Sequence, residues 1–187
     1  MRTNITDPDV QLLVSISGAL QLDYENPGTD PWEGSPFQWI VHTRSSRRKG
    51  AIGERLVAGW AAAKDLDVVR SPNSEADRVI DGHLVEIKFS TLWENGTYTF
   101  QQIREQTYDV LFCLGISPFD AHAWVIPKAV LREHVIGMTG QHTGAAGQET
   151  AWMKDVDPSN PPSWLRPYGG TLREAFSVLV GMGRGKS

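Results

Sequence analysis

The chain has 187 residues, and its 18 Lys and Arg against 22 Asp and Glu give a formal net charge of −4 at pH 7. A chain of this length fits one ordinary domain with its own core. A hydrophobic fraction of 40%, with seven Trp and six Phe, excludes an intrinsically disordered protein. The net charge does not indicate a polyanion partner, so any nucleic-acid contact requires a local basic patch.

Cysteine content and the N-terminal residues indicate the compartment. The single cysteine, Cys113, lies in an apolar stretch and has no partner in the chain, which excludes a disulfide scaffold. Asp7 and Asp9 stand where a secretory signal would carry positive charge, and no apolar run approaches the ~20 residues of a spanning helix. We therefore expect a cytoplasmic protein without a membrane segment.

The first half of the chain predicts helices followed by strands. The apolar spacing predicts a short helix over residues 10–20, and the Pro/Gly/Asp-rich residues 26–36 predict a loop. Residues 50–64, rich in Ala, Leu, Glu and Lys, predict a helix preceded by a basic run. Strands are predicted over residues 68–69, 76–80 and 83–89.

The second half predicts a further helix, two strands and a closing helix. Asn95-Gly96 indicates a turn, after which Thr99 is expected to cap a helix over residues 100–107. Continuous apolar residues predict strands over 110–116 and 122–126, the first buried on both faces. Loops are expected over 137–147 and 155–162 and a helix over 172–180. The fold class is therefore α/β, with the order α-β-β-β-α-β-β, a central mixed sheet flanked by helices, and N- and C-terminal additions.

The turn between two of these strands places two acidic residues together. Asp81-Gly82 favours a two-residue hairpin turn, which pairs Ile80 with His83 and therefore places Asp77 opposite Glu86. Directly opposed residues have Cβ atoms about 4.5 to 5.5 Å apart, and like charges at that distance are destabilising. The pair therefore requires a cation, and carboxylate oxygens with retained waters suit Mg²⁺.

Lys88 and Ile87 complete the chemistry of this strand. Lys88 lies two residues after Glu86, so its ammonium falls on the same face as both carboxylates. Ile87 points toward the core, but its carbonyl can face the ion. Such a set can hold a divalent ion, a water and a phosphate oxygen, and can stabilise the charge that develops during in-line attack on phosphorus.

Glu54 is a fourth candidate, on the helix predicted over residues 50–64. Its helical neighbours are Val57, Ala58 and Ala61, so the carboxylate lies on or beside the apolar face, where it is costly unless paired. It can support a second metal or orient a water. The basic run before this helix can hold a nucleic-acid backbone.

Together, Gly53-Glu54, Asp77 and Glu86-Ile87-Lys88 resemble the motifs of the PD-(D/E)XK nuclease superfamily. The resemblance covers residues 50–128 and implies a restriction-endonuclease-like core. It also implies that Asp77 and Glu86 bind the metal, that Lys88 positions or activates the attacking water, and that Glu54 is an auxiliary acid. Ala76 stands where the nominal Pro of the motif would be.

The segments outside that core are similar to the additions of type II restriction endonucleases. The resemblance implies a Mg²⁺-dependent endonuclease, with Mn²⁺ expected to substitute, that cuts double-stranded DNA at specific sequences as a homodimer. We expect one nuclease domain over residues 1–187, in which residues 1–49 and 129–187 serve DNA binding or dimerisation. The expected catalytic residues are Asp77, Glu86, Lys88 and Glu54, and the expected metal ligands are Asp77, Glu86 and the Ile87 carbonyl. The expected DNA contacts are Arg47, Arg48, Lys49, Gln101, Gln102, Arg104, Gln141 and His142.

Two other functions are compatible with these residues. A structure-selective repair nuclease or a Holliday-junction-resolving nuclease would use the same four catalytic residues. A catalytically idle DNA-binding module of the same fold would need none of them. Asp81 is an alternative to Asp77 as the acidic ligand, although its place in the turn explains it structurally.

Overall fold

The computed structural model describes residues 11–12, 14–16, 30–138, 140–143 and 149–183, without the side chains of residues 141–143, 149 and 183. The chain divides into two compact units, Met1–Glu33 and Gly34–Ser187. In the first unit, residues 11–12 and 14–16 are helical and fall within the helix predicted over residues 10–20. Among the described residues, no helix has the length and apolar composition that crossing a membrane requires.

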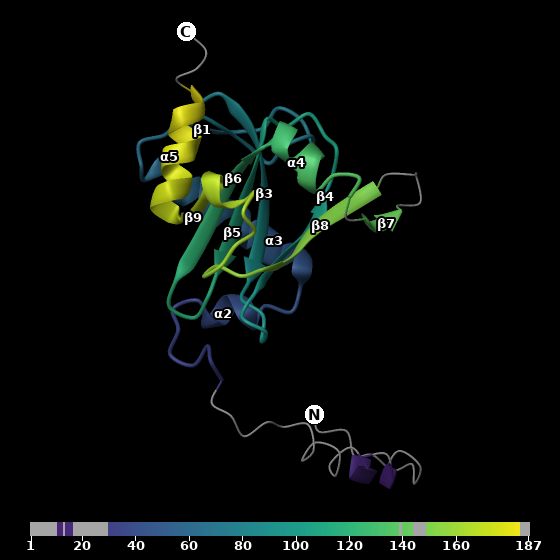
Figure 1. The fold of residues 1–187 in the computed structure, drawn as a ribbon. Helices are drawn as coiled ribbons and strands as arrows, with labels where there is room; N and C mark the ends of the chain where they lie inside the picture. The colour runs from purple at the N-terminus through teal and green to yellow at the C-terminus, as the bar shows by residue number, and fades with distance from the viewer. Residues whose placement is uncertain (1–10, 13, 17–29, 139, 144–148, 184–187) are drawn as a thin grey trace. The chain divides into compact units, whose positions relative to one another are not determined.

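The second unit is built around a mixed six-stranded sheet (Figure 1). Its strand order is β1-β2-β3-β5-β6-β9, in which β3 and β5 are parallel and the other neighbours are antiparallel. The strands are β1 (Val68–Arg70), β2 (Arg78–Ile80), β3 (His83–Thr91), β5 (Val110–Ile116), β6 (Ala121–Pro127) and β9 (Gly169–Thr171). All seven residues of β5 are buried, as the continuous apolar run predicts. The predicted central mixed sheet is confirmed.

Two helices cover one face of this sheet. They are α3 (Ser46–Ala62) and α5 (Leu172–Gly183), the second matching the predicted closing helix, and a short helix α2 (Gln38–Val41) precedes α3. The Trp60 ring of α3 packs edge-on against Phe112 of β5 at 5.7 Å and Phe176 of α5 at 6.1 Å. Trp60 therefore joins both helices to the central strand.

A second, three-stranded sheet packs on the opposite face. Its order is β4-β8-β7, from β4 (Tyr98–Ile103), β8 (Glu149–Val156) and β7 (Gly140–Thr143), and helix α4 (Lys128–His134) lies beside it. The shared core contains Leu111, Cys113, Trp124 and Ile126 of the large sheet together with Tyr98, Phe100, Leu131 and Met153. In Figure 1, α5 lies to the left of the central strands and α4, β8 and β7 lie to the right.

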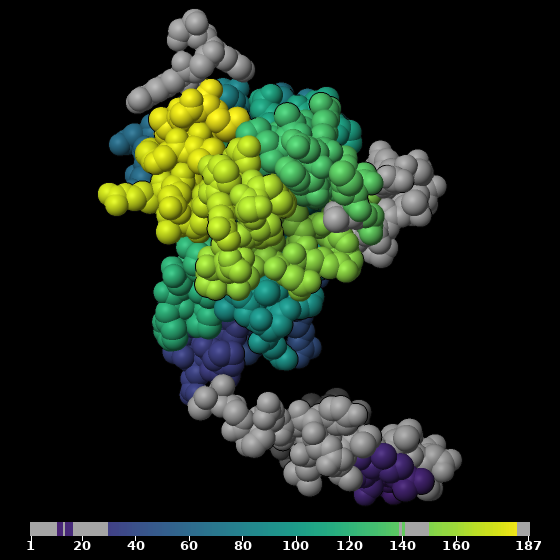
Figure 2. All heavy atoms as spheres, viewed as in Figure 1, coloured from purple at the N-terminus to yellow at the C-terminus, as the bar shows by residue number. Residues whose placement is uncertain are grey.

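The segment after β8 runs between α5 and α4 on the face shown in Figure 2. It includes a 3-10 turn, η1 (Arg166–Tyr168), and leads into β9. The ring of Trp164 stacks on His134 of α4, with centroids 4.8 Å apart and planes at 14°. The chain that follows the loop predicted over 155–162 is thus packed against α4 through the stacked rings of Trp164 and His134.

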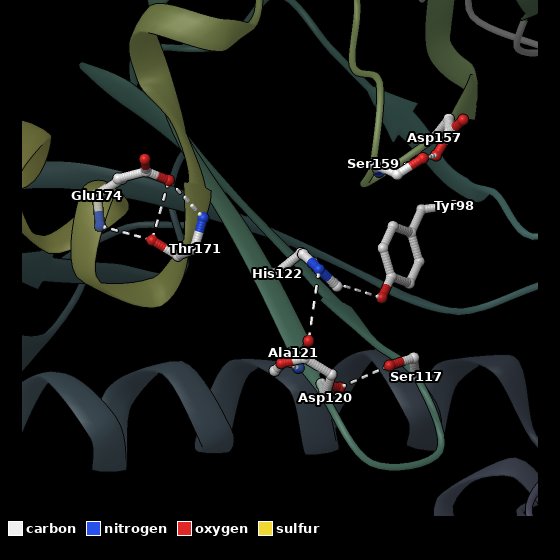
Figure 3. Close-up of polar contacts among 9 residues, drawn as sticks. All are labelled: Tyr98, Ser117, Asp120, Ala121, His122, Asp157, Ser159, Thr171 and Glu174. Atoms are coloured by element: carbon white, nitrogen blue, oxygen red, sulfur yellow. Dashed lines mark hydrogen bonds and ion pairs between the residues drawn. The ribbon is translucent and has the colours of Figure 1, made fainter.

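One residue pair bridges the two sheets (Figure 3). The hydroxyl of Tyr98 on β4 is hydrogen bonded to Nδ1 of His122 on β6 at 3.0 Å, and His122 Nε2 lies 3.8 Å from Asp120 Oδ2. Burial raises the pKa of Tyr98 to about 12, so the hydroxyl stays protonated. Nearby, Glu174 accepts the backbone N–H of Thr171 at 2.8 Å and its own N–H donates to Thr171 Oγ1 at 3.2 Å, a capping box that starts α5.

The helix predicted over residues 100–107 is wrong, because residues 98–103 form strand β4. Phe100 and Ile103 are both buried, and a spacing of three is typical of one helix face. Here the spacing arises from a bulge, since Gln102 has a φ of 57° and the register with β8 shifts between Phe100 and Ile103. An extra strand residue thus imitates helical periodicity. The observed order is not the expected α-β-β-β-α-β-β.

Two other elements differ from the expected ones. Residues 140–143, within the expected loop over 137–147, form strand β7, and residues 149–156, for which no strand was predicted, form β8. Helix α3 begins at Ser46 and not at residue 50, because Ser45 caps it by accepting the backbone N–H of Arg48 at 3.3 Å. Arg47, Arg48 and Lys49 are consequently in the first turn of the helix and not ahead of it.

Candidate active site

The hairpin that carries the acidic residues has the predicted register. Ile80 pairs with His83, Val79 with Leu84 and Arg78 with Val85, so a two-residue turn joins β2 and β3. Asp77 is the next residue outward and its N–H donates to the carbonyl of Val85 at 3.0 Å. Asp81 is a residue of the turn itself. Its carboxylate accepts the backbone N–H of Asp67, which directly precedes β1, at 2.8 Å. Asp77, and not Asp81, therefore lies beside Glu86.

The β2–β3 ladder ends at Asp77, and its side chain takes the place of the next backbone partner. Oδ2 of Asp77 accepts the N–H of Ile87 at 2.7 Å. In a strand, the N–H and C=O of one residue point to the same side, so the Ile87 carbonyl also faces this open edge. The Ile87 side chain is 6% exposed and points into the core, as expected.

Glu86 and Lys88 lie side by side on β3. Lys88 Nζ is 2.7 Å from Glu86 Oε1, and Glu86 is 8% exposed. The two side chains share a face, as strand alternation predicts. A buried carboxylate is tolerated here because the ammonium pairs with it.

Glu54 reaches the same place from α3. Its Oε2 lies 3.7 Å from Nη1 of Arg78, which also donates to the Asp77 carbonyl at 2.6 Å. The preceding residue, Gly53, lies against Phe89 of β3 so closely that a Cβ on it would fall 2.3 Å from the Phe89 Cβ. Glycine at position 53 therefore lets the helix approach β3 and carry Glu54 to the site.

The three carboxylates influence one another electrostatically. Burial, followed by the charge of Asp77, raises the pKa of Glu54, although Arg78 and Lys88 oppose this. Burial also raises the pKa of Glu86, the charges of Asp77 and Glu54 add to the increase, and Lys88 lowers it. Burial and mutual repulsion thus disfavour the ionised carboxylates, and a cation bound between them would relieve both effects.

These residues line one pocket of about 470 Å³. It contains Glu54, Asp77, Glu86, Ile87 and Lys88, the full set of expected catalytic and metal-binding residues. Four expected DNA-contact residues line it too, namely Arg47, Lys49, Gln101 and Gln102. The remaining lining comes from Ser46, Gly50, Phe89, Ser90, Thr91, Trp93 and Thr99.

The other expected DNA contacts lie elsewhere. Arg48 is exposed on the first turn of α3 and does not line this pocket. Arg104 lines a separate pocket of about 440 Å³ with Glu75 and Glu105. Gln141 and His142 lie on β7, but their side chains are outside the described part of the chain.

The donor set fits Mg²⁺ better than a metal that requires many protein ligands. Within the described residues, no group of three or more His, Cys, Asp or Glu side chains is arranged to hold a metal ion. Asp77, Glu86 and the Ile87 carbonyl offer two carboxylates and one neutral oxygen at the open edge of β3. Mg²⁺ typically takes one or two carboxylates and keeps several waters, so this small oxygen set is compatible with it.

Sequence reasoning did not assign Trp93, Thr99 or Arg78 to the site. Trp93 and Thr99 line the pocket and Arg78 pairs with Glu54. Strand alternation places the side chains of Arg78 and Asp77 on opposite faces. Arg78 pairs with Glu54 because of where α3 packs, which the sequence does not show. Thr99 was expected to cap a helix, so its position in strand β4 and beside the pocket was not predicted.

The chain matches no protein-family model and no curated protein. Among solved structures it is similar to a bacterial homing endonuclease, I-Ssp6803I, with a TM-score of 0.50 and 18% sequence identity. The similarity covers 76% of this chain and 96% of that chain. At this identity the likeness concerns the fold alone, so the chain shares a mixed α/β fold with that protein.

Proposed function

We propose that this protein is a Mg²⁺-dependent endonuclease that hydrolyses phosphodiester bonds in double-stranded DNA. The observation that carries the proposal is the pocket in which Asp77, Glu86 and Lys88 meet two basic side chains of α3, Arg47 and Lys49. The fold that the chain shares with a homing endonuclease supports it. Membership of the PD-(D/E)XK superfamily is part of the proposal.

Each residue has a chemical role in this proposal. Asp77, Glu86 and the Ile87 carbonyl hold the ion, which when bound neutralises charge on the phosphate and polarises its oxygen. Lys88, held by Glu86 at 2.7 Å, donates a hydrogen bond that orients the attacking water. Glu54 accepts from that water or from one beside it, and Arg47 and Lys49 hold the flanking phosphates.

Restriction-type, sequence-specific cleavage by a homodimer is the finer form of the proposal. A two-fold protein matches a palindromic duplex and places one site on each strand. The site described above belongs to one chain, so each protomer would cut one strand.

Cleavage of supercoiled plasmid in Mg²⁺ tests the proposal. We expect the chain to nick and linearise the plasmid and EDTA to stop it. We expect Lys88→Ala to reduce the rate by about 100-fold or more. Lys64 is exposed just after the end of α3, and Lys64→Ala should leave the rate unchanged. Undiminished cutting by Lys88→Ala would remove the mechanism.

Cleavage of branched and linear DNA, together with duplex binding, separates the two alternatives. A repair or junction-resolving nuclease would cut branched DNA and spare linear duplex. A catalytically idle DNA-binding module would bind duplex without EDTA-sensitive nicking.

A further inference from the structure

The bulge in β4 lies beside the candidate active site and is formed by two consecutive glutamines, Gln101 and Gln102. Phe100 pairs with Met153 and Ile103 with Ala151, so Gln101 and Gln102 together oppose the single residue Trp152. In a regular strand, neighbouring side chains alternate between the faces. Here Gln102 has a φ of 57°, and both glutamines are exposed and line the pocket of Glu86 and Lys88.

This conformation is unfavourable for the residue that adopts it. A positive φ at a residue other than glycine costs free energy and is found where the surrounding structure maintains it, often at functional sites. Glycine would satisfy the backbone here at lower cost. The bulge lets two adjacent carboxamides line the pocket, whereas a regular strand would direct only one of them to it.

The neighbouring strand adds a basic and an aromatic side chain to the same face. Ala151 and Met153 of β8 are buried in the core between the sheets, so Trp152 between them lies on the outer face with the glutamines. The ammonium of Lys154 lies 3.5 Å from the centre of the Trp152 ring. Lys154 is exposed, so its charge is available to a phosphate beside the glutamines.

We propose that Gln101 and Gln102 read base edges in the major groove of duplex DNA next to the cleaved phosphate, with A·T as the preferred pair. This inference rests on the proposed nuclease function and names how that site selects its substrate. A glutamine carboxamide can donate to N7 and accept from the amino group at N6 of adenine at the same time. Strands of a sheet can enter the major groove, which is about 12 Å wide, and β4 is an edge strand of the β4-β8-β7 sheet.

The aromatic residue favours a duplex over an unpaired strand. Proteins that bind single strands stack bases on exposed aromatic faces. Trp152 is half-buried and Lys154 covers one face of its ring, so that face is closed to a stacked base and the ammonium lies on the same sheet face as the carboxamides. These groups suit a phosphate and the edge of a paired base.

Selection of bound sequences from a randomised duplex library tests the inference. The full chain carrying Lys88→Ala, in Mg²⁺, is expected to bind the library while cutting it slowly, and the bound, uncut pool is sequenced. Gln101→Ala and Gln102→Gly are added to that chain one at a time; Gln102→Gly retains the positive φ. The matched control is Gln106→Ala, whose side chain donates to the Ser74 carbonyl and lines the other pocket.

We expect fixed A·T pairs in the selected pool and a loss of about 5- to 150-fold in preference at one position for each glutamine variant. Affinity for random duplex should stay within about twofold of the parent and thermal midpoints should be preserved, since the removed groups contact bases. Gln106→Ala should keep the preference. An unchanged preference in both glutamine variants, an equal loss in Gln106→Ala, or stronger binding to single strands would overturn the inference.

Plasmid cleavage by the wild-type chain keeps this outcome distinct from failure of the proposed function. EDTA-sensitive cutting combined with an unchanged preference in the glutamine variants rejects base reading and leaves the nuclease intact. Absence of both cutting and duplex binding rejects the two together.

Discussion

Asp77 and Ile87 are joined by a hydrogen bond in which a side chain replaces the backbone of a strand. The Asp77 carboxylate accepts the Ile87 N–H at 2.7 Å, at the point where β2 no longer pairs with β3. One oxygen of Asp77 is thereby held at the edge, and the Ile87 carbonyl faces the same side. The end of the β2–β3 ladder therefore brings a carboxylate and a backbone carbonyl to the same edge of β3.

Asp77→Asn and Asp77→Ala separate the charge of this residue from its hydrogen bond. The asparagine retains an oxygen for the Ile87 N–H but has no negative charge, so we expect DNA cleavage to fall about 100-fold or more with little change in the free energy of unfolding. The alanine should cost a further ~1 kcal/mol in that free energy, because it removes the acceptor. Plasmid cleavage and urea denaturation measure the two effects. Equal stability of the two variants would contradict the role of the hydrogen bond.

The raised pKa values of Glu54 and Glu86 predict a pH dependence for stability and metal binding. In the metal-free protein, each contributes stability below its usual pKa of 4.5, and this contribution is lost as the pH rises through the raised value. Mg²⁺ binds the ionised carboxylates, so it should raise the thermal midpoint at neutral pH. This increase should become smaller as the pH falls through the raised pKa values of Glu54 and Glu86, because protonated carboxyl groups bind the ion weakly. Thermal denaturation with and without Mg²⁺ across about pH 4 to 8 measures this. An increase of the same size at every pH would contradict the site.

Gly53→Ala tests the approach of α3 to β3. The new Cβ would lie 2.3 Å from the Phe89 Cβ, so the helix must move, at a cost of about 1–3 kcal/mol in the free energy of unfolding. Because Glu54 moves with the helix, we also expect slower cleavage. Gly59→Ala on the same helix is the control, since it has open space and should gain about 0.5–1 kcal/mol from helix propensity. Chemical denaturation compares the two, and equal stability would contradict the contact.

Arg47→Gln and Lys49→Gln test the basic first turn of α3. Both side chains line the pocket. Each substitution should weaken binding to any duplex and reduce the slope of log affinity against log salt by about 1, because one phosphate contact is lost. Fluorescence anisotropy at several salt concentrations measures the slope. Arg173→Gln on α5 makes the same charge change away from the pocket and should leave the slope unchanged. An equal decrease in slope for Arg173→Gln would mean that the net charge of the protein, and not a phosphate contact in the pocket, causes the effect.

The sequence by itself determined the hairpin and most of the site it carries. The turn at Asp81-Gly82 sets the register of the strands it joins, so the position of Asp77 beside Glu86 follows from local chemistry. The alternation of a strand then places Lys88 with Glu86. The helices predicted over 50–64 and 172–180 from composition and periodicity are present, with observed bounds of 46–62 and 172–183.

Only the tertiary structure decided the second sheet and the surface beside the pocket. β4 pairs with β8, some 50 residues further along the chain, and this partner together with a bulge at Gln102 outweighs a spacing that is typical of a helix. The approach of α3, which brings Glu54 and Arg78 together, depends on packing between Gly53 and Phe89. Local patterns carry no information about which distant strand completes a ladder, because pairing energy is realised only when both strands are in place.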